Sequence, residues 1–231
     1  MFFFDPTYLL FALPGLLLAL WAQWRVKSTF NTYSQVPTGR HISGLEAAKI
    51  LMRNNGLNIG IQGIAGQLTD HYDPRDKSTS LSDGSADNSI AAVAVVAHEL
   101  GHAQQDAENY LPLKLRGAIV PAVQIGGWVG PVLFLIGILI GITELAWLGV
   151  IAFGLTTIFA LVTLPVEFDA SNRAMTMLQS SGILVNDELK GARKMLNAAA
   201  LTYVAAALQS ILTMLYYVML LSGGSRRSRR F

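Results

Sequence analysis

The chain has 231 residues, of which 52% are hydrophobic and only 14% are charged, and its formal net charge is +2. A soluble domain carries roughly 25% charged residues, so the composition excludes a wholly water-facing surface and predicts a membrane protein with a water-facing part. Cysteine is absent, which excludes disulfides, a cysteine nucleophile and thiolate metal ligands. Four of the last six residues are arginine, and without them the chain is slightly acidic, so no nucleic-acid partner is indicated.

Four apolar stretches are long enough to cross a bilayer, which takes about 20 residues as a helix. They lie at residues 8–24, 118–140, 145–164 and 198–221. Only four residues separate the second stretch from the third, so we expect a tight hairpin there. Gly126 and Gly130 predict close packing of membrane helices. The first stretch has no basic region before it and no small-residue cleavage site after it, so we expect a membrane helix and not a signal peptide.

The polar segment between the first two stretches is expected to fold as a small α+β part. Residues typical of helix starts and of turns divide this segment into short elements, with Gly, Asn and Pro between them. The expected elements are a helix from Ser43 or Gly44 to Asn55-Gly56, short strands within 57–81, and an amphipathic helix over 86–108.

The last of these helices contains the motif His98-Glu99-Leu100-Gly101-His102. Because an α-helix turns once in 3.6 residues, the two histidines lie on one face, one turn apart. Both imidazoles can reach one zinc ion at about 2.0–2.1 Å. Glu99 is rotated about 100° from His98, where a base can take a proton from zinc-activated water and pass it to the leaving amine. The small Gly101 permits close approach of a neighbouring backbone or of a substrate. The alternative is two incidental histidines paired with Glu99.

A catalytic zinc takes three protein ligands and leaves one position open. With no cysteine in the chain and no histidine after His102, we expect a carboxylate from a later helix. The best candidate is Glu167, at the end of the third apolar stretch, where an unpaired carboxylate is costly. Asp169 points about 200° away on the same helix, so only one of the two can face the metal. The longer side chain favours Glu167, and Asp169 would then face Arg173, one turn further on.

Three motifs together resemble the YugP-type bacterial zinc metallopeptidases. They are the His-Glu motif, Pro-Val-Glu-Phe-Asp-Ala-Ser at 165–171 and Thr-Asp-His-Tyr-Asp-Pro at 69–74. The chain is more distantly similar to the HtpX heat-shock membrane protease and the CAAX prenyl protease. The resemblance implies one zinc ion per chain, Glu167 as third ligand, and endopeptidase activity on membrane or membrane-proximal polypeptides. In the distant relatives an aspartate four residues after the glutamate supports a ligand histidine; here Ser171 stands at that position, with Asp169 nearby.

Further candidates concern stabilisation of the oxyanion that forms during peptide hydrolysis. His71 and Tyr72 lie in a predicted strand, and Asn172 and Arg173 lie about one turn past Glu167. Each could donate a hydrogen bond to the oxyanion, and each has an ordinary structural role as the alternative. The basic tail is expected to meet anionic headgroups or solvent.

The sequence therefore predicts a mainly α membrane protein with four transmembrane helices and a small α+β, zincin-like catalytic part at one membrane face. Its expected parts are the first membrane helix (1–24), the catalytic part (25–117), the membrane hairpin (118–164), the third-ligand helix with its following segment (165–197), and the last membrane helix with the tail (198–231). Thirteen of the 17 lysines and arginines lie in 25–116 and 167–194. This bias favours a cytoplasmic catalytic face in a bacterial cell membrane.

The predicted function is that of a zinc metalloendopeptidase, with a polypeptide substrate and the lipid bilayer as partners. One alternative is a non-enzymatic membrane scaffold with a structural zinc, which has no need of a base at Glu99. Another is an intramembrane protease, which would place the motif helix inside a span of about 20 apolar residues. Polar residues bracket only a short apolar run around the motif, so the sequence favours a site outside the bilayer core.

Overall fold

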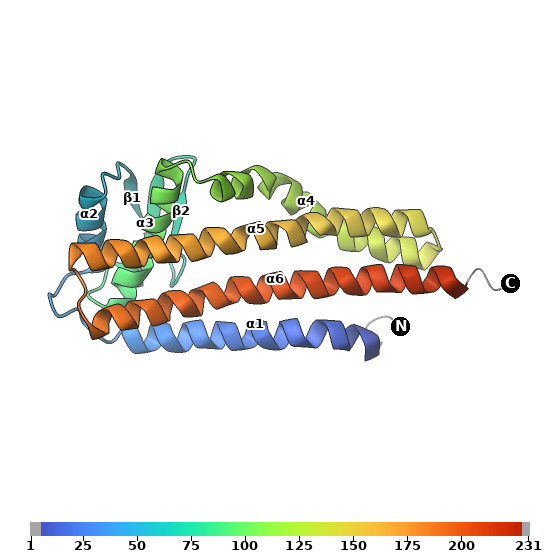
Figure 1. The fold of residues 1–231 in the computed structure, drawn as a ribbon, viewed down its shortest axis with the longest axis horizontal. Coiled ribbons are helices and arrows are strands. Elements are labelled where there is room, and N and C mark those ends of the chain that lie inside the picture. The colour runs from blue at the N-terminus through green and yellow to red at the C-terminus, as the bar shows by residue number, and fades with distance from the viewer. Residues whose placement is uncertain (1–5, 228–231) are drawn as a thin grey trace. The chain divides into compact units, whose positions relative to one another are not determined.

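The computed structural model describes residues 6–227, with side chains described for 6–223, and most of this chain is helical (Figure 1). The side chains of the basic tail lie outside this described part. The elements in chain order are α1 (Pro6–Tyr33), α2 (Gly44–Asn54), β1 (Gly60–Ile64), β2 (His71–Asp73), β3 (Ser78–Ser82), the 3-10 helix η2 (Asp83–Ser85), α3 (Ile90–Ala107), α4 (Leu111–Ile140), α5 (Thr143–Ser181) and α6 (Asp187–Arg227).

Four helices, α1, α4, α5 and α6, are long and apolar enough to cross a membrane by length and composition. The expected apolar stretches fall inside them, but α5 and α6 are longer, with 39 and 41 residues. At a rise of 1.5 Å per residue each is about 60 Å long, about twice the 30 Å hydrocarbon core of a bilayer. Each of these two helices is therefore longer than a bilayer crossing needs. Its apolar stretch is only one part of it, and the remaining turns carry more polar residues.

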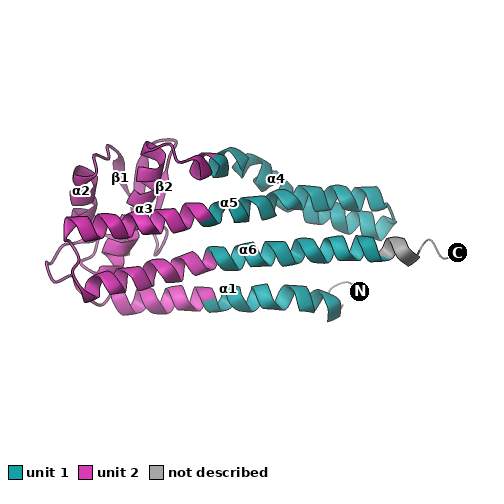
Figure 2. Ribbon diagram, viewed as in Figure 1, with its two compact units in different colours: residues 1–21, 115–164, 203–231 teal, residues 22–114, 165–202 magenta. Residues whose placement is uncertain are grey.

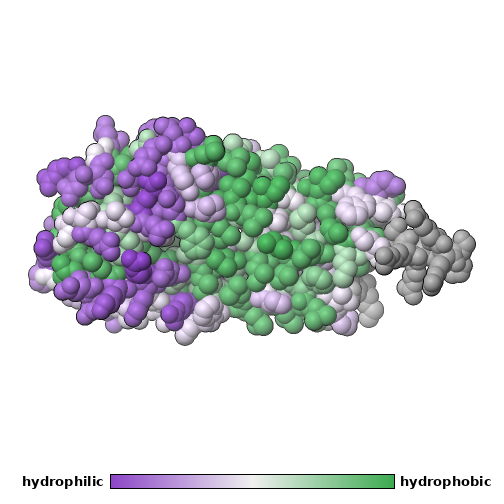
Figure 3. Space-filling view, in the orientation of Figure 1, coloured by the Kyte–Doolittle hydropathy of each residue, from purple (hydrophilic) through white to green (hydrophobic). Residues whose placement is uncertain are grey.

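The chain divides into two compact units (Figure 2). Unit 1 comprises residues 1–21, 115–164 and 203–231, and unit 2 comprises 22–114 and 165–202. Figure 3 shows hydrophobic side chains over most of the visible face of unit 1, whereas hydrophilic side chains gather over unit 2. The boundaries expected at residues 24 and 164 fall inside α1 and α5, because these helices contribute to both units.

Within unit 1, α4 and α5 form the expected tight hairpin. The turn between them contains Gly141, whose φ of 76° is in the left-handed region that glycine adopts without strain. A Cβ added at Gly130 would lie only 2.7 Å from the backbone nitrogen of Phe153 on α5. The helices therefore approach as closely as the small residues of this segment predicted. A larger side chain at Gly130 would push them apart.

Within unit 2, three strands form a sheet of order β1-β3-β2. The strand β1 pairs with β3 in parallel, with Gly60 opposite Ser78, and β2 pairs with β3 antiparallel, with His71 opposite Ser80. The central strand β3 is buried along almost its whole length. The short strands expected within residues 57–81 are thus present, joined to the helices as a small α+β part.

The helix α2 begins where the sequence indicated, after Ser43. The Ser43 hydroxyl accepts a hydrogen bond from the Glu46 amide at 3.3 Å, and the Glu46 carboxylate accepts one from the Ser43 amide at 2.9 Å. This reciprocal pair is a capping box, which satisfies two backbone donors that a helix start leaves free.

The core of unit 2 is built around α3. This helix begins at Ile90 after its N-cap Ser89, four residues later than expected, because residues 83–85 form a separate 3-10 turn. Thirteen of its 18 residues are buried, so the helix expected to be amphipathic is a central helix of this unit. Its small apolar side chains pack in one cluster with Leu51 of α2, Leu178 of α5 and Met195 of α6.

Candidate metal centre

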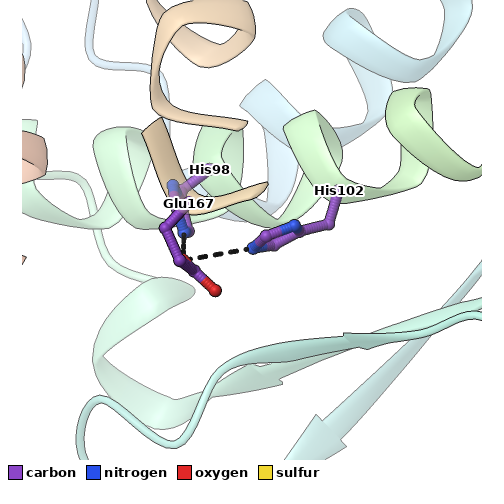
Figure 4. Close-up of side chains that lie close together, drawn as sticks. All are labelled: His98, His102 and Glu167. Atoms are coloured by element: carbon purple, nitrogen blue, oxygen red, sulfur yellow. Dashed lines mark hydrogen bonds and ion pairs between the residues drawn. The ribbon is translucent and has the colours of Figure 1, made fainter. Parts of the chain in front are cut away.

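Two histidines of α3 face the same space, one turn apart (Figure 4). The ring centroids of His98 and His102 are 4.8 Å apart, and the ring planes are nearly perpendicular at 81°. The helix is held rigidly because its neighbouring residues Ala97 and Leu100 are fully buried in the core of unit 2. The spacing predicted from the motif therefore gives two imidazoles on a buried and well-packed support.

A carboxylate from α5 points at both rings (Figure 4). The Glu167 Oε2 atom lies 3.2 Å from His98 Nε2 and 3.5 Å from His102 Nε2. Its residue is only 2% exposed. One donor atom from each of the three residues lies within 4.8 Å of the other two. The structure thus brings together the three residues that the sequence nominated as metal ligands.

The donor set and its separations fit a zinc ion. Two imidazole nitrogens and one carboxylate oxygen are ordinary zinc ligands, each at about 2.0–2.2 Å from the metal. In a tetrahedron with such bonds, neighbouring ligand atoms are about 3.4 Å apart. The nitrogen–oxygen separations of 3.2 and 3.5 Å match that edge. Two of the three donor–donor separations thus fit one zinc ion held by these three side chains.

The approach of α5 to α3 depends on Gly101. A Cβ built on this glycine would lie 2.4 Å from the carbonyl oxygen of Ala170 and 3.0 Å from its carbonyl carbon, both backbone atoms of α5. Any side chain at position 101 would therefore force the two helices apart. Ala170 is one turn beyond Glu167, so this crossing point sets how far the carboxylate reaches toward the histidines. The neighbouring backbone expected beside Gly101 is thus α5.

Each histidine is held from behind through its Nδ1 atom. His102 Nδ1 lies 3.0 Å from Gln105 Oε1, and His98 Nδ1 lies 3.3 Å from Ser171 Oγ. Ser171, the residue at the position of the supporting aspartate in the distant relatives, therefore contacts His98. Asp169 instead accepts a hydrogen bond from Gln105 Nε2 at 2.8 Å. Metal-ligating histidines commonly have such a partner on the other ring nitrogen.

Arg173 lies next to Asp169 and donates hydrogen bonds to two carboxylates. Its Nε atom donates to Asp169 Oδ2, as the one-turn spacing predicted, and its Nη1 atom donates to Glu108 Oε2 at 2.6 Å. The guanidinium also lies 5.7 Å from the ring centre of Tyr110. Arg173 therefore fixes Asp169 and the end of α3, and the neighbouring candidate Asn172 is exposed.

The other two oxyanion candidates, His71 and Tyr72, lie in β2 and make contacts of their own. The Tyr72 hydroxyl donates to Asp106 Oδ2 at 2.8 Å, and burial together with this bond raises the pKa of that hydroxyl. His71 is exposed, with its Nδ1 atom 3.0 Å from the Thr69 carbonyl oxygen. Neither belongs to the group formed by the two motif histidines and Glu167.

Glu99 is buried beside the two histidines, with 7% of its surface exposed. Burial of His102 disfavours its charged form, but the carboxylates of Glu167 and Glu99 outweigh this and raise the pKa of the His102 imidazole. The site thus concentrates negative charge around its imidazoles, a field that also favours a bound cation.

Gln105 is a contact residue that sequence reasoning missed. Its spacing of three residues from His102 was the available signal, since residues three apart lie on the same helix face.

The chain is similar to proteins described as peptidases. The sequence model of a family described as "Putative neutral zinc metallopeptidase" matches residues 8–222. The chain belongs to this family. It is 43% identical over 219 residues, covering 94% of its own length and 97% of the relative's, to "Putative membrane protease YugP" of Bacillus subtilis (strain 168). No solved structure matches the chain significantly.

Membership of this zinc metallopeptidase family confirms the resemblance that the three sequence motifs carried. It implies zinc as the cofactor and a polypeptide as the substrate class, and the four apolar helices agree with a membrane-bound member. The more distant similarity to HtpX and to the CAAX prenyl protease stays a prediction, as does a zincin-like relationship of the catalytic part.

Proposed function

We propose that this protein is a zinc-dependent membrane endopeptidase that hydrolyses peptide bonds of membrane or membrane-proximal proteins. The observation that carries the proposal is the convergence of one ligand atom each from His98, His102 and Glu167, all within 4.8 Å of one another, in a chain of a zinc metallopeptidase family. These three side chains would hold one zinc ion. Unit 2 would be the catalytic part, and the apolar helices of unit 1 would anchor it in the membrane, with a cytoplasmic catalytic face.

The chemistry divides between the metal and Glu99. Zinc supplies a Lewis acid that brings the pKa of a water molecule toward 7 and polarises the scissile carbonyl. Glu99 follows His98 directly on α3, and its carboxylate accepts a proton from the attacking water and returns it to the leaving amine. The buried surroundings strengthen both electrostatic effects because little water competes with them. The bonds of His102 to Gln105 and of His98 to Ser171 keep both rings aimed at the same point.

The coordination number separates this proposal from a structural zinc in a membrane scaffold. A structural zinc site is closed by four protein ligands, whereas a catalytic site has three and an open position. Among residues 6–223 the group contains three donors, His98, His102 and Glu167. A group of three donors and a neighbouring buried carboxylate at Glu99 both favour catalysis. Of the described helices, α3 is not among those apolar enough to span a membrane, which argues against cleavage in the bilayer core.

The test is zinc content together with hydrolysis by the purified full chain in detergent. We expect one zinc per chain and chelator-sensitive digestion of casein. Glu99→Gln should keep the zinc and lose hydrolysis, and H98A or H102A should lose both. His41→Ala removes an exposed histidine and serves as the matched control for the histidine variants, while Glu144→Gln serves for Glu99. Near-normal hydrolysis by Glu99→Gln would exclude Glu99 as the base.

A second pair of variants tests the third ligand. Glu167→Ala should reduce zinc affinity and activity steeply, because Glu167 is the α5 side chain that contacts both imidazoles. Asp169→Ala should do much less, since Asp169 contacts Gln105, which in turn contacts His102. If the two effects were reversed, Asp169 would be the ligand and the proposed donor set would be wrong.

A further inference from the structure

The side chain of Gln105 is fully buried and makes three hydrogen bonds. Its Oε1 atom lies 3.0 Å from His102 Nδ1, and its Nε2 atom donates to the Val166 carbonyl at 2.8 Å and to Asp169 Oδ2 at 2.8 Å. The exposed fraction of the residue is 0%. One amide therefore joins a candidate ligand on α3 to the backbone and a side chain of α5.

These three contacts fix the orientation of the amide. A glutamine has two N–H donors on its nitrogen and only acceptor capacity on its oxygen. Both neighbours of Nε2, the Val166 carbonyl and the Asp169 carboxylate, are acceptors. Rotating the amide by 180° would bring its oxygen against both of these acceptors, with no hydrogen between them. The oxygen therefore faces His102.

The orientation of the amide in turn selects the tautomer of His102. An amide oxygen can only accept, so His102 Nδ1 carries a hydrogen, and in the neutral ring the lone pair is then on Nε2. That Nε2 atom is the one that points toward Glu167. The hydroxyl of Ser171 behind His98 makes no such selection, because a hydroxyl can either donate or accept.

We infer that Gln105 is a positioning residue, which holds His102 in the tautomer that can bind zinc and links it to α5. The inference rests on the proposed function, since it assigns Gln105 a purpose only if the site binds a metal. The link continues outward, because Asp169 is bound by Arg173, which is bound by Glu108. The residue at position 105 thus connects the two helices that contribute the candidate ligands.

The neutral charge of Gln105 suits its surroundings. Glu167 and Glu99 already place two carboxylates beside the histidines, and Asp169 lies 2.8 Å from the Gln105 nitrogen. A glutamate at this position would set two carboxylates against each other in a buried place, where like charges repel strongly. Glutamine supplies the acceptor that His102 needs together with the donors that α5 needs, and it adds no charge.

The decisive experiment compares Gln105→Met with Gln104→Met in the full chain. Methionine is similar to glutamine in length and flexibility but makes no comparable hydrogen bonds. Gln104 is the preceding, half-buried residue of the same helix, so its variant controls for the substitution itself. Zinc affinity, measured by chelator competition, should fall about 10–100-fold in Gln105→Met and stay within about twofold in Gln104→Met.

Histidine-selective nitrogen NMR provides a readout that a general loss of packing would not give. The chain has only four histidines, so each ring can be assigned with single variants. In metal-free protein at a pH where imidazole is neutral, wild-type His102 should carry its hydrogen on Nδ1. In Gln105→Met the hydrogen should move to Nε2, because Glu167 is then the remaining acceptor beside the ring.

A third variant keeps the inference testable if methionine disrupts folding. Gln105→Glu retains an acceptor for His102 and loses both donors to α5, so the Nδ1 tautomer should persist in it. An unchanged tautomer together with unchanged zinc affinity in Gln105→Met would overturn the inference. Wild-type protein that binds no zinc, yet shows the tautomer change in metal-free Gln105→Met, would instead overturn the proposed function.

Discussion

Gly101→Ala is the substitution whose effect follows most directly from the structure. The added Cβ would lie 2.4 Å from the Ala170 carbonyl oxygen, whereas a relaxed contact between carbon and oxygen is about 3.3 Å. The helices α3 and α5 must therefore separate by about 0.9 Å, because both clashing partners are backbone. Metal–ligand distances tolerate only about 0.2 Å. Glu167 is one turn from the clash, so its carboxylate should be withdrawn from the histidines.

The effect on stability should be smaller than the effect on the site. Overpacking of a core costs about 1–3 kcal/mol, while alanine in place of glycine inside a helix contributes about 1 kcal/mol of stabilisation. The two effects partly cancel, and we expect the free energy of unfolding to fall by about 0–2 kcal/mol. Zinc affinity should fall by more than about tenfold, a loss typical when the support of a ligand is disturbed.

The assay is chelator competition for zinc, with helical content followed by circular dichroism in the same samples. Gly117→Ala on α4 is the matched control, since a Cβ at that position meets no atom within 4 Å. It should leave zinc affinity unchanged. A Gly101→Ala protein that binds zinc as tightly as the wild type would refute the reasoning, because the close crossing would then not govern the reach of Glu167.

Three further predictions address metal, capping and topology. Removing zinc with a chelator should lower the midpoint of thermal unfolding, and adding zinc back should restore it. The physical reason is that a ligand present at 100 times its Kd stabilises the folded state by about 2.7 kcal/mol. A midpoint that does not change would contradict a zinc site. Ser43→Ala should weaken α2 by about 1 kcal/mol, seen as faster amide hydrogen exchange in that helix. Hydrogen bonds from the amide and hydroxyl of Ser43 lower the pKa of Glu46. The stability that ionised Glu46 contributes is therefore present above its unfolded-state pKa and is lost as pH falls through its lower folded-state pKa. The loss of stability caused by Ser43→Ala should accordingly become smaller in acid. Topology reporters fused within residues 141–144 should report the non-cytoplasmic side, and a cytoplasmic signal there would reverse the proposed orientation of the catalytic face.

The sequence by itself determined the features that depend on neighbouring residues. The periodicity of a helix places His98 and His102 on one face whatever surrounds them, and the capping box at Ser43 uses only atoms three residues apart. The lengths of the apolar stretches likewise indicate which helices can cross a bilayer. Glu167 was reached by elimination, because cysteine is absent and no histidine follows His102.

Only the tertiary structure decided which distant residues complete the site. Glu167 lies 69 positions after His98, and its contact with the imidazoles depends on the crossing of α3 and α5 at Gly101. The strands could be expected, but their order β1-β3-β2 could not, because the turn residues that bound a strand do not specify its pairing partner. The role of Gln105 was hidden for the same reason. Its partners on α5, Val166 and Asp169, are brought to it by packing between helices, which the pattern of either helix alone does not encode.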